Sequence, residues 1–270
     1  MRRCLALLLL SCAVTPAFAA ESYDGCAGFI DSLPATITTQ GVWCLRKDLS
    51  TAATWGAAIT IATNNVTVDC NGFKIGGLGG GPTSQTRGVH AQDRLNATVR
   101  NCALRGFYIG VSLYGGGHLV EDNRVDQSLW SGINVGGEHN LVQRNRVFDT
   151  GSDAQFSVGI WAEADVRDNI VDGVAEGGSL TGIYVYGTGA EVRNNTVRNI
   201  EAVYGAEGIR AEGSHHSMIG NRVVISSPTP PPVSAGIIAS DVGNSNCRDN
   251  LVAGFEYPFQ CEDNGGNVAH

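Results

Sequence analysis

The sequence predicts an all-β protein built as a parallel β-solenoid. Two recurring patterns and the lack of helical periodicity support this prediction. The first pattern is an apolar residue, two polar residues, an asparagine, any residue and a second apolar residue, recurring eight times at intervals of 21 to 31 residues. The second, glycine-apolar-any-apolar, recurs between these copies, and helical periodicity is missing. Three short strands in each repeat favour stacked coils over an antiparallel sandwich, which requires no fixed period.

The asparagine pattern is expected at a bend between two strands. Its central position is occupied in turn by Asn71, Cys102, Asn123, Asn145, Asn169, Asn195, Asn221 and Asn250. Amides stacked in such a column can bond the coils above and below, as in asparagine ladders. The flanking apolar residues are predicted to be buried: Val120, Val142, Val166 and Val192 before the bend, and Val125, Val147, Val171 and Val197 after it.

The glycine pattern predicts a short strand whose outer two residues point inward and whose middle residue points outward. Its glycines are Gly88, Gly110, Gly132, Gly159, Gly182, Gly208 and Gly236, and residues 58–61 and 258–261 are its first and last members. Stacking these strands predicts two outward columns. One runs Thr60, His90, Ser112, Asn134, Trp161, Tyr184, Arg210, Ile238, and the other Ala62, Gln92, Tyr114, Gly136, Glu163, Tyr186, Glu212, Ser240.

The amino terminus is predicted to be an export signal. A basic start, an apolar stretch too short to span a bilayer and Ala17-Phe18-Ala19 fit a signal peptide over residues 1–19, hence a secreted or periplasmic protein without a transmembrane segment. The alternative is a lipoprotein with Cys12 lipidated. Residues 20–55 are expected to form an N-terminal cap, with Val42, Trp43 and Leu45 buried. The β-helix is predicted over 56–262 and a tail over 263–270.

Composition excludes several classes of protein. Glycine accounts for 36 of 270 residues and charged residues for 16%, which excludes disorder and a long coiled coil. The net charge of −8 argues against nucleic-acid binding, and removal of the signal would leave it near −10.

Over residues 55–262 the repeat resembles the right-handed parallel β-helix of the pectate-lyase-like superfamily, through its asparagine-bearing turn and its three-strand coil. The resemblance implies a right-handed single β-helix, here of about nine coils, and a polysaccharide as the class of ligand. The expected partner is therefore a polysaccharide or cell-envelope glycan. It implies no particular reaction. The clustered aspartates of polygalacturonase-like hydrolases, the Asp-Pro-His triplet of alginate epimerases and the calcium-site acids of pectate lyases have no convincing match.

Six cysteines remain after the signal, and in an oxidising compartment they predict three disulfides. Cys26–Cys44 would tie the cap, Cys70–Cys102 would join turns one coil apart, and Cys247–Cys261 would close the last coil. Metal ligation is the alternative, but Cys-x-x-Cys pairs are absent.

The candidate site lies on the outward glycine strands. Five segments lengthen one turn of the coil and are expected to overhang this surface: 74–87, 148–158, 172–181, 198–207 and 224–235. Trp161, Tyr184 and Tyr186 are predicted to bind a sugar chain, together with Asn134, His90 and Asp153. A stabilising external stack of side chains is the alternative.

Candidate catalytic residues are Glu163, Glu212 and Arg210. The two carboxylates are expected two coils apart, roughly 9–10 Å, near the upper limit for an inverting glycosidase pair. A lyase would need a base, for which Arg210 is the candidate, and a cation such as Ca²⁺, with Asp149, Asp153 and Asp172 nearby. His118, His215 and His216 are expected at the surface. Two classes of function remain: an exported polysaccharide lyase or glycoside hydrolase, and a non-catalytic glycan- or envelope-binding solenoid.

Overall fold

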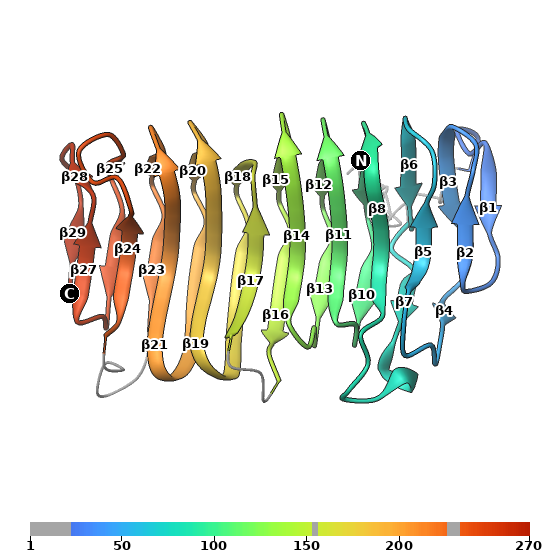
Figure 1. The fold of residues 1–270 in the computed structure, drawn as a ribbon, viewed down its shortest axis with the longest axis horizontal. Helices are drawn as coiled ribbons and strands as arrows, with labels where there is room; N and C mark the ends of the chain where they lie inside the picture. The colour runs from blue at the N-terminus through green and yellow to red at the C-terminus, as the bar shows by residue number, and fades with distance from the viewer. Residues whose placement is uncertain (1–22, 153–155, 226–232) are drawn as a thin grey trace, which may run out of the picture.

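The computed structural model describes residues 23–152, 156–225 and 233–270 and shows a right-handed parallel β-helix of about nine coils. Successive coils stack side by side along the long axis (Figure 1). The predicted fold is therefore confirmed. The predicted export signal and Asp153 lie outside the described residues. No helix in the described part of the chain is long and apolar enough to cross a membrane.

Each coil presents three faces, named here in chain order. The first face precedes the asparagine bend and consists of β1 (Gly28–Ile30), β3 (Gly41–Leu45), β6 (Val66–Asp69), β9 (Thr98–Arg100), β12 (Leu119–Glu121), β15 (Leu141–Gln143), β18 (Asp165–Arg167), β20 (Glu191–Arg193), β22 (Ser217–Ile219), β25 (Asn246–Arg248) and β28 (Glu262–Asp263).

The second face follows the bend and consists of β4 (Leu49–Ser50), β7 (Lys74–Gly76), β10 (Ala103–Arg105), β13 (Arg124–Asp126), β16 (Arg146–Thr150), β23 (Arg222–Val224), β26 (Leu251–Ala253) and β29 (Val268–Ala269). The glycine face consists of β2 (Ala35–Ile37), β5 (Ala57–Ile61), β8 (Arg87–Leu95), β11 (Ile109–Gly116), β14 (Ser131–Glu138), β17 (Phe156–Ala162), β24 (Ala235–Ala239) and β27 (Tyr257–Gln260). A 3₁₀ turn, η1 (Leu78–Gly80), follows β7.

Two strands run through both the second and the glycine face: β19 (Ile170–Thr188) and β21 (Thr196–Ser214). They pair with each other from Ile170–Thr196 to Thr188–Ser214. Residues 172–181 and 198–207 are therefore paired strand, and the prediction of overhanging loops is wrong there. The reason is that the two segments have the same length and lie in neighbouring coils. The backbone groups of one segment can therefore pair with those of the other.

The predicted core is confirmed. All eight valines that flank the bend are at most 1% exposed. The repeated glycines have a packing role as well: a Cβ at Gly182 would lie 2.3 Å from Cγ1 of Val197 and 2.7 Å from the carbonyl oxygen of Gly208. The glycine strand and the second face thus approach too closely for any side chain at that position.

The asparagine ladder is present. Each amide donates to a backbone carbonyl in the preceding coil and to the amide oxygen of the next asparagine, through Asn123, Asn145, Asn169, Asn195, Asn221 and Asn250. The last acceptor is Asn267, whose own amide donates to Cys247 O and Asp263 Oδ1. Asn267 extends the ladder beyond the predicted motif, and at the first coil the backbone N–H of Cys102 donates to Asn123 Oδ1. Asn71 lies outside the ladder, because its bend is longer and its backbone is left-handed, with φ of 50°.

All three predicted disulfides are formed. Cys26–Cys44 has a Cα–Cα distance of 5.9 Å, Cys70–Cys102 of 4.7 Å and Cys247–Cys261 of 6.0 Å, within the usual range.

Both ends of the described chain contribute strands to the solenoid. β1 pairs with β3 and β2 pairs with β5, while β28 and β29 pair with β25 and β26. Leu45 is buried as predicted, but Val42 and Trp43 are only partly buried. Trp43 packs over Gly28 of the edge strand β1, and its indole donates to the carbonyl of Thr39.

Two histidines are buried, in contrast to the prediction. His118 and His216 are 1% and 0% exposed and occupy the corner between the glycine face and the first face. His118 Nδ1 accepts a bond from Ala97 N, and His216 N donates to Ser245 Oγ. Burial lowers the pKa of both imidazoles.

We expect the two buried histidines to make the fold less stable in acid. Because each pKa is lower in the folded chain than its unfolded value of 6.5, the unfolded chain binds more protons once the pH falls below about 6.5. The two neutral histidines therefore contribute fully to stability above that pH, and their contribution is lost as the pH falls below it. Urea unfolding of His118→Asn, which copies Asn140 in the next coil, should show a smaller loss between pH 8 and pH 5 than wild type. The exposed control His139→Asn should match wild type, and equal losses in all three proteins would contradict the assignment.

Candidate functional site

A row of aromatic rings crosses the glycine face. Neighbouring centroids are 5.7 Å apart for Tyr108 and Trp130, 5.4 Å for Trp130 and Trp161, 5.0 Å for Trp161 and Tyr184, and 6.2 Å for Tyr184 and Tyr186. All five rings are partly exposed. We call these five residues the aromatic row. It spans four consecutive coils and presents apolar ring surface to solvent.

Strand register explains how the row arises. The predicted first column is confirmed by pairing, with His90 opposite Ser112, Asn134 opposite Trp161, and Tyr184 opposite Arg210. Trp161 and Tyr184 are therefore neighbours, and Tyr186 follows two residues along β19. Tyr108 and Trp130 precede the glycine strands, in the short connections that lead into β11 and β14. The row thus runs obliquely, from one corner of the face towards the other.

A cavity of about 380 Å³ opens along the row. It is lined by Tyr114, Trp130, Asn134, Trp161, Tyr184, Tyr186 and Glu212. Five of these are residues of the predicted site. Asn134 is only 4% exposed, because the larger neighbouring side chains cover it. It lies at the bottom of the cavity and offers an amide there.

A charged network flanks the row on its C-terminal side. Arg210 Nη1 lies 2.8 Å from Glu207 Oε1, and Arg210 Nη2 lies 3.6 Å from Glu212 Oε2. The Tyr184 hydroxyl donates to Glu212, and the guanidinium lies 5.8 Å from the Tyr184 ring centroid. Burial and this hydrogen bond raise the pKa of Tyr184 to about 12. Glu212 is thereby held in place by a cation and by a phenol that stays protonated.

Arg210 is held as a cation. Burial works against its charge, but the carboxylates of Glu207 and Glu212 outweigh burial and raise the pKa of Arg210 above its usual value. This environment favours a role in orienting Glu212 and donating hydrogen bonds over a role as a base.

Glu163 lies at the other border of the row. Its Oε2 accepts a 2.8 Å bond from Gly137 N. Burial, and then the negative charge of Glu163, raise the pKa of Tyr186 to about 12. Glu163, Tyr186 and Glu212 occupy successive coils, so the backbones of the two glutamates are two strand spacings apart, about 9–10 Å.

His90 is not among the residues that line the cavity along the row. Three coil steps separate it from Trp161, through Ser112 and Asn134. Its Nδ1 is hydrogen-bonded to Ser112, and burial and then the charge of Arg87 lower its pKa. Asp153 cannot be placed, since it lies outside the described residues. Sequence analysis missed Tyr108, Trp130 and Tyr114 as members of the site, although Tyr114 was in the predicted second column.

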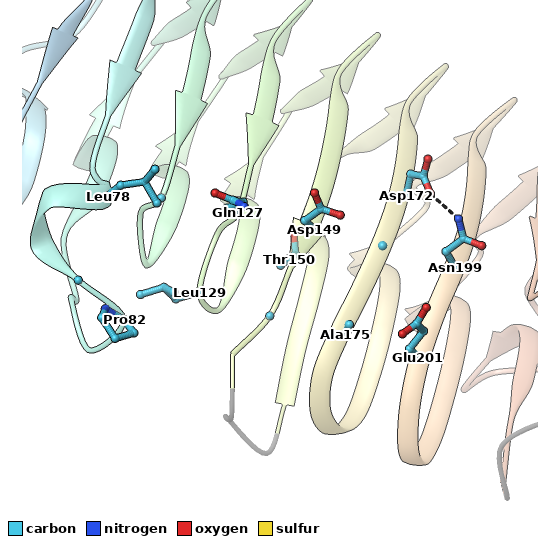
Figure 2. A pocket seen from close by; sticks show the side chains of 14 residues that line it. Leu78, Pro82, Gln127, Leu129, Asp149, Thr150, Asp172, Ala175, Asn199 and Glu201 are labelled. Carbon is cyan, nitrogen blue, oxygen red and sulfur yellow. Dashed lines mark hydrogen bonds between the residues drawn. The ribbon is translucent and has the colours of Figure 1, made fainter.

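Asp149 and Asp172 line a different cavity, of about 630 Å³, at the corner between the second face and the glycine face (Figure 2). Leu78 and Pro82 form one wall, and Glu201 lies at the opposite end. Asp172 is bound to Arg198 and Asn199, each at 2.7 Å. The two aspartates therefore lie apart from the aromatic row, with which this cavity shares no lining residue. Across residues 23–152, 156–225 and 233–270, no group of three or more His, Cys, Asp or Glu residues could hold a metal ion.

The fold and this face define a right-handed parallel β-helix that carries an aromatic surface. The family model of the right handed beta helix region matches residues 55–202, and the chain belongs to this family. No curated protein matches the sequence.

Three solved structures are similar in fold. The Dettilon tailspike protein gp208 has a TM-score of 0.49 and 16% identity over 88% of this chain and 56% of that one, so the chain spans little more than half of the tailspike. The A-module of the Azotobacter vinelandii mannuronan C-5 epimerase AlgE6 has a TM-score of 0.46 and 13% identity over 85% of this chain and 80% of that one. The DFA-IIIase of Arthrobacter chlorophenolicus A6, solved without its lid in complex with GF2, has a TM-score of 0.38 and 12% identity over 84% and 68%.

Proposed function

We propose that this protein is exported and binds a polysaccharide along the aromatic row. The observation that carries the proposal is the row itself. Five partly exposed rings follow one another at centroid spacings of 5.0–6.2 Å across a rigid surface. Such rings stack on the apolar faces of sugar residues, while flanking carboxylates, amides and guanidinium groups bond the hydroxyls.

The flanking polar groups suit binding. Glu212 is fixed by Arg210 and Tyr184, Glu163 is fixed by Gly137 N, and Asn134 lies beneath the rings. Each carboxylate has two oxygens, so both can accept hydroxyl groups while keeping these contacts. Side chains that are held before the ligand arrives lose little entropy on binding.

Hydrolysis of the bound chain is the second candidate function. The placement of Glu163 and Glu212 on the two coils that adjoin the coil of Tyr186 favours it, because two strand spacings, about 9–10 Å, are near the upper limit for an inverting pair. The two candidates share a ligand surface and differ in whether turnover occurs.

Glu212→Gln separates the two candidates, because it keeps the shape of the side chain and removes its charge. If the protein only binds, we expect a change in affinity of less than about tenfold and no product from either protein. If Glu212 acts as an acid or base, binding should persist while turnover falls by about 10² or more. The measurement is a polysaccharide panel scored for binding, reducing ends and unsaturated product, with and without calcium. A panel in which no polysaccharide binds wild type would overturn the proposal.

A further inference from the structure

One coil is shorter than its neighbours at the corner between the glycine face and the first face. Residues 162–164 alone connect Trp161 to Asp165, whereas 135–140 and 185–190 make the same connection in the coils on either side. β17 ends at Ala162, but β14 and β19 continue to Glu138 and Thr188. Strand pairing on both faces stays in register, so the three missing residues leave a gap between two longer turns. The gap is a cavity of about 610 Å³, which we call the notch.

The notch is held open by the side chains around it. The Gly137 backbone, which would face the missing residues, instead bonds Glu163 Oε2 through its N–H and Asn140 Nδ2 through its carbonyl. Asn140 Nδ2 also donates to the Glu163 carbonyl at 3.1 Å. These bonds satisfy the backbone groups that the short coil leaves unpaired at the strand edge. The two longer turns can therefore remain apart. On the far side, a Cβ at Gly189 would meet open space.

Tyr186 joins the notch to the aromatic row. It lines both the notch and the cavity along the row. Its hydroxyl lies 2.8 Å from the position of a Cβ added at Gly136, two coils away, so the ring leans back across the short coil. The row runs obliquely towards this corner, and a chain that follows the rings past Tyr184 arrives at the notch.

The lining of the notch selects the kind of sugar. Glu138 and Glu163 supply carboxylate oxygens, and Leu141, Ala164 and Ala190 supply apolar surface. The carboxylate of Asp165 is already bonded to Arg167 and to Glu191 N. No lysine or arginine is among its lining residues. Oxygen acceptors suit the hydroxyl donors of a sugar, whereas a uronate carboxylate would be repelled by Glu138 and Glu163. The one basic residue in the lining, His139, lies beside Glu138.

We infer that the notch binds an uncharged sugar residue at the end of the chain that lies on the aromatic row. The inference rests on the proposed function and adds to it the position of one end of the ligand and the class of sugar. It also assigns Glu163 a part in recognition, as an acceptor for hydroxyl groups at the floor of the notch.

Titration calorimetry with sugars of two lengths tests the inference. The probes are the hexasaccharides and trisaccharides of cellulose, mannan and xylan, with hexasaccharides of galacturonate and mannuronate for comparison. Thr188→Trp places a large side chain on the rim of the notch. Ser214→Trp is its matched control, because Ser214 pairs with Thr188 one coil further on and lies outside the notch. Circular dichroism confirms that each variant is folded.

We expect a neutral hexasaccharide to bind wild type more tightly than the trisaccharide and more tightly than either uronate hexasaccharide. Thr188→Trp should weaken binding of the hexasaccharide by about tenfold and leave the trisaccharide unchanged, while Ser214→Trp changes neither. The inference fails if Thr188→Trp leaves hexasaccharide binding intact, if the control matches it, or if only uronates bind. In those cases the proposed function survives, provided that Trp161→Ala still weakens binding. If none of the probes binds wild type, both the inference about the notch and the proposed function fail.

Discussion

Replacing Asn169 with alanine is expected to destabilise the protein by about 3–4 kcal/mol, the largest effect that we predict for stability. Asn169 is 1% exposed and lies in the middle of the ladder. Its Oδ1 accepts bonds of 2.9 and 3.1 Å from the backbone and side chain of Asn145, and its Nδ2 donates to Val142 O at 2.9 Å. Alanine removes the partner of two buried backbone groups, Asn145 N and Val142 O, at about 1–3 kcal/mol each. Asn145 Nδ2 keeps its bond to Val120 O.

The measurement is the free energy of unfolding in urea, with Asn244→Ala as the control. Asn244 is exposed and its amide bonds only the nearby Asp241, so its loss should stay within about 0.5 kcal/mol of wild type. Because each coil of a solenoid contacts only its neighbours, an effect at a central coil cannot be compensated from the ends. A loss below about 1 kcal/mol for Asn169→Ala would mean that the ladder is not a main source of stability.

The repeat made the coil predictable to the level of single side chains. A period-two strand fixes which residues point outward, and a repeated glycine that must contact the second face fixes where each strand begins. Asn134, Trp161 and Tyr184 could therefore be aligned before their contacts were known, and pairing confirms that alignment. Two of the disulfide pairs followed from the same register, since Cys70 and Cys102 fall one coil apart and Cys247 and Cys261 belong to the last coil.

Contacts outside the repeating pattern were not predictable in this way. Tyr108 and Trp130 each lie two residues before the repeated glycine, outside the motif from which the outward columns were predicted. Their stacking at 5.7 Å, and the 5.4 Å contact of Trp130 with Trp161, place them in the row. His118 resembled a surface turn residue, because the corner bonds that bury it come from Ala97 and Asn140 in neighbouring coils. The short coil at 162–164 is visible in the sequence as a missing triplet. The notch that it opens depends on how Gly137 and Asn140 close the exposed strand edge.

Trp161→Ala should weaken binding of any polysaccharide that occupies the row by about 1–2 kcal/mol, or about 5- to 30-fold in Kd. Trp161 is central to the row, with ring centroids at 5.4 Å to Trp130, 5.0 Å to Tyr184 and 5.9 Å to Phe156. Alanine removes stacking surface at this position and interrupts the row between Trp130 and Tyr184. A chain bound across several coils then has two short contact surfaces in place of one continuous surface.

Two further variants make the result specific to the ring. Trp161→Phe keeps an aromatic face and should retain most of the affinity, whereas Trp55→Ala removes a tryptophan that is 70% exposed but outside the row and should change nothing. Binding is measured by titration calorimetry on variants whose circular dichroism matches wild type. If Trp161→Ala remains folded and binds every ligand of the wild type with unchanged affinity, the rings form an external stack that supports the coils. If Trp161→Ala and Trp55→Ala weaken binding equally, the contact is nonspecific apolar adsorption, because the two side chains share exposed indole surface but not the row.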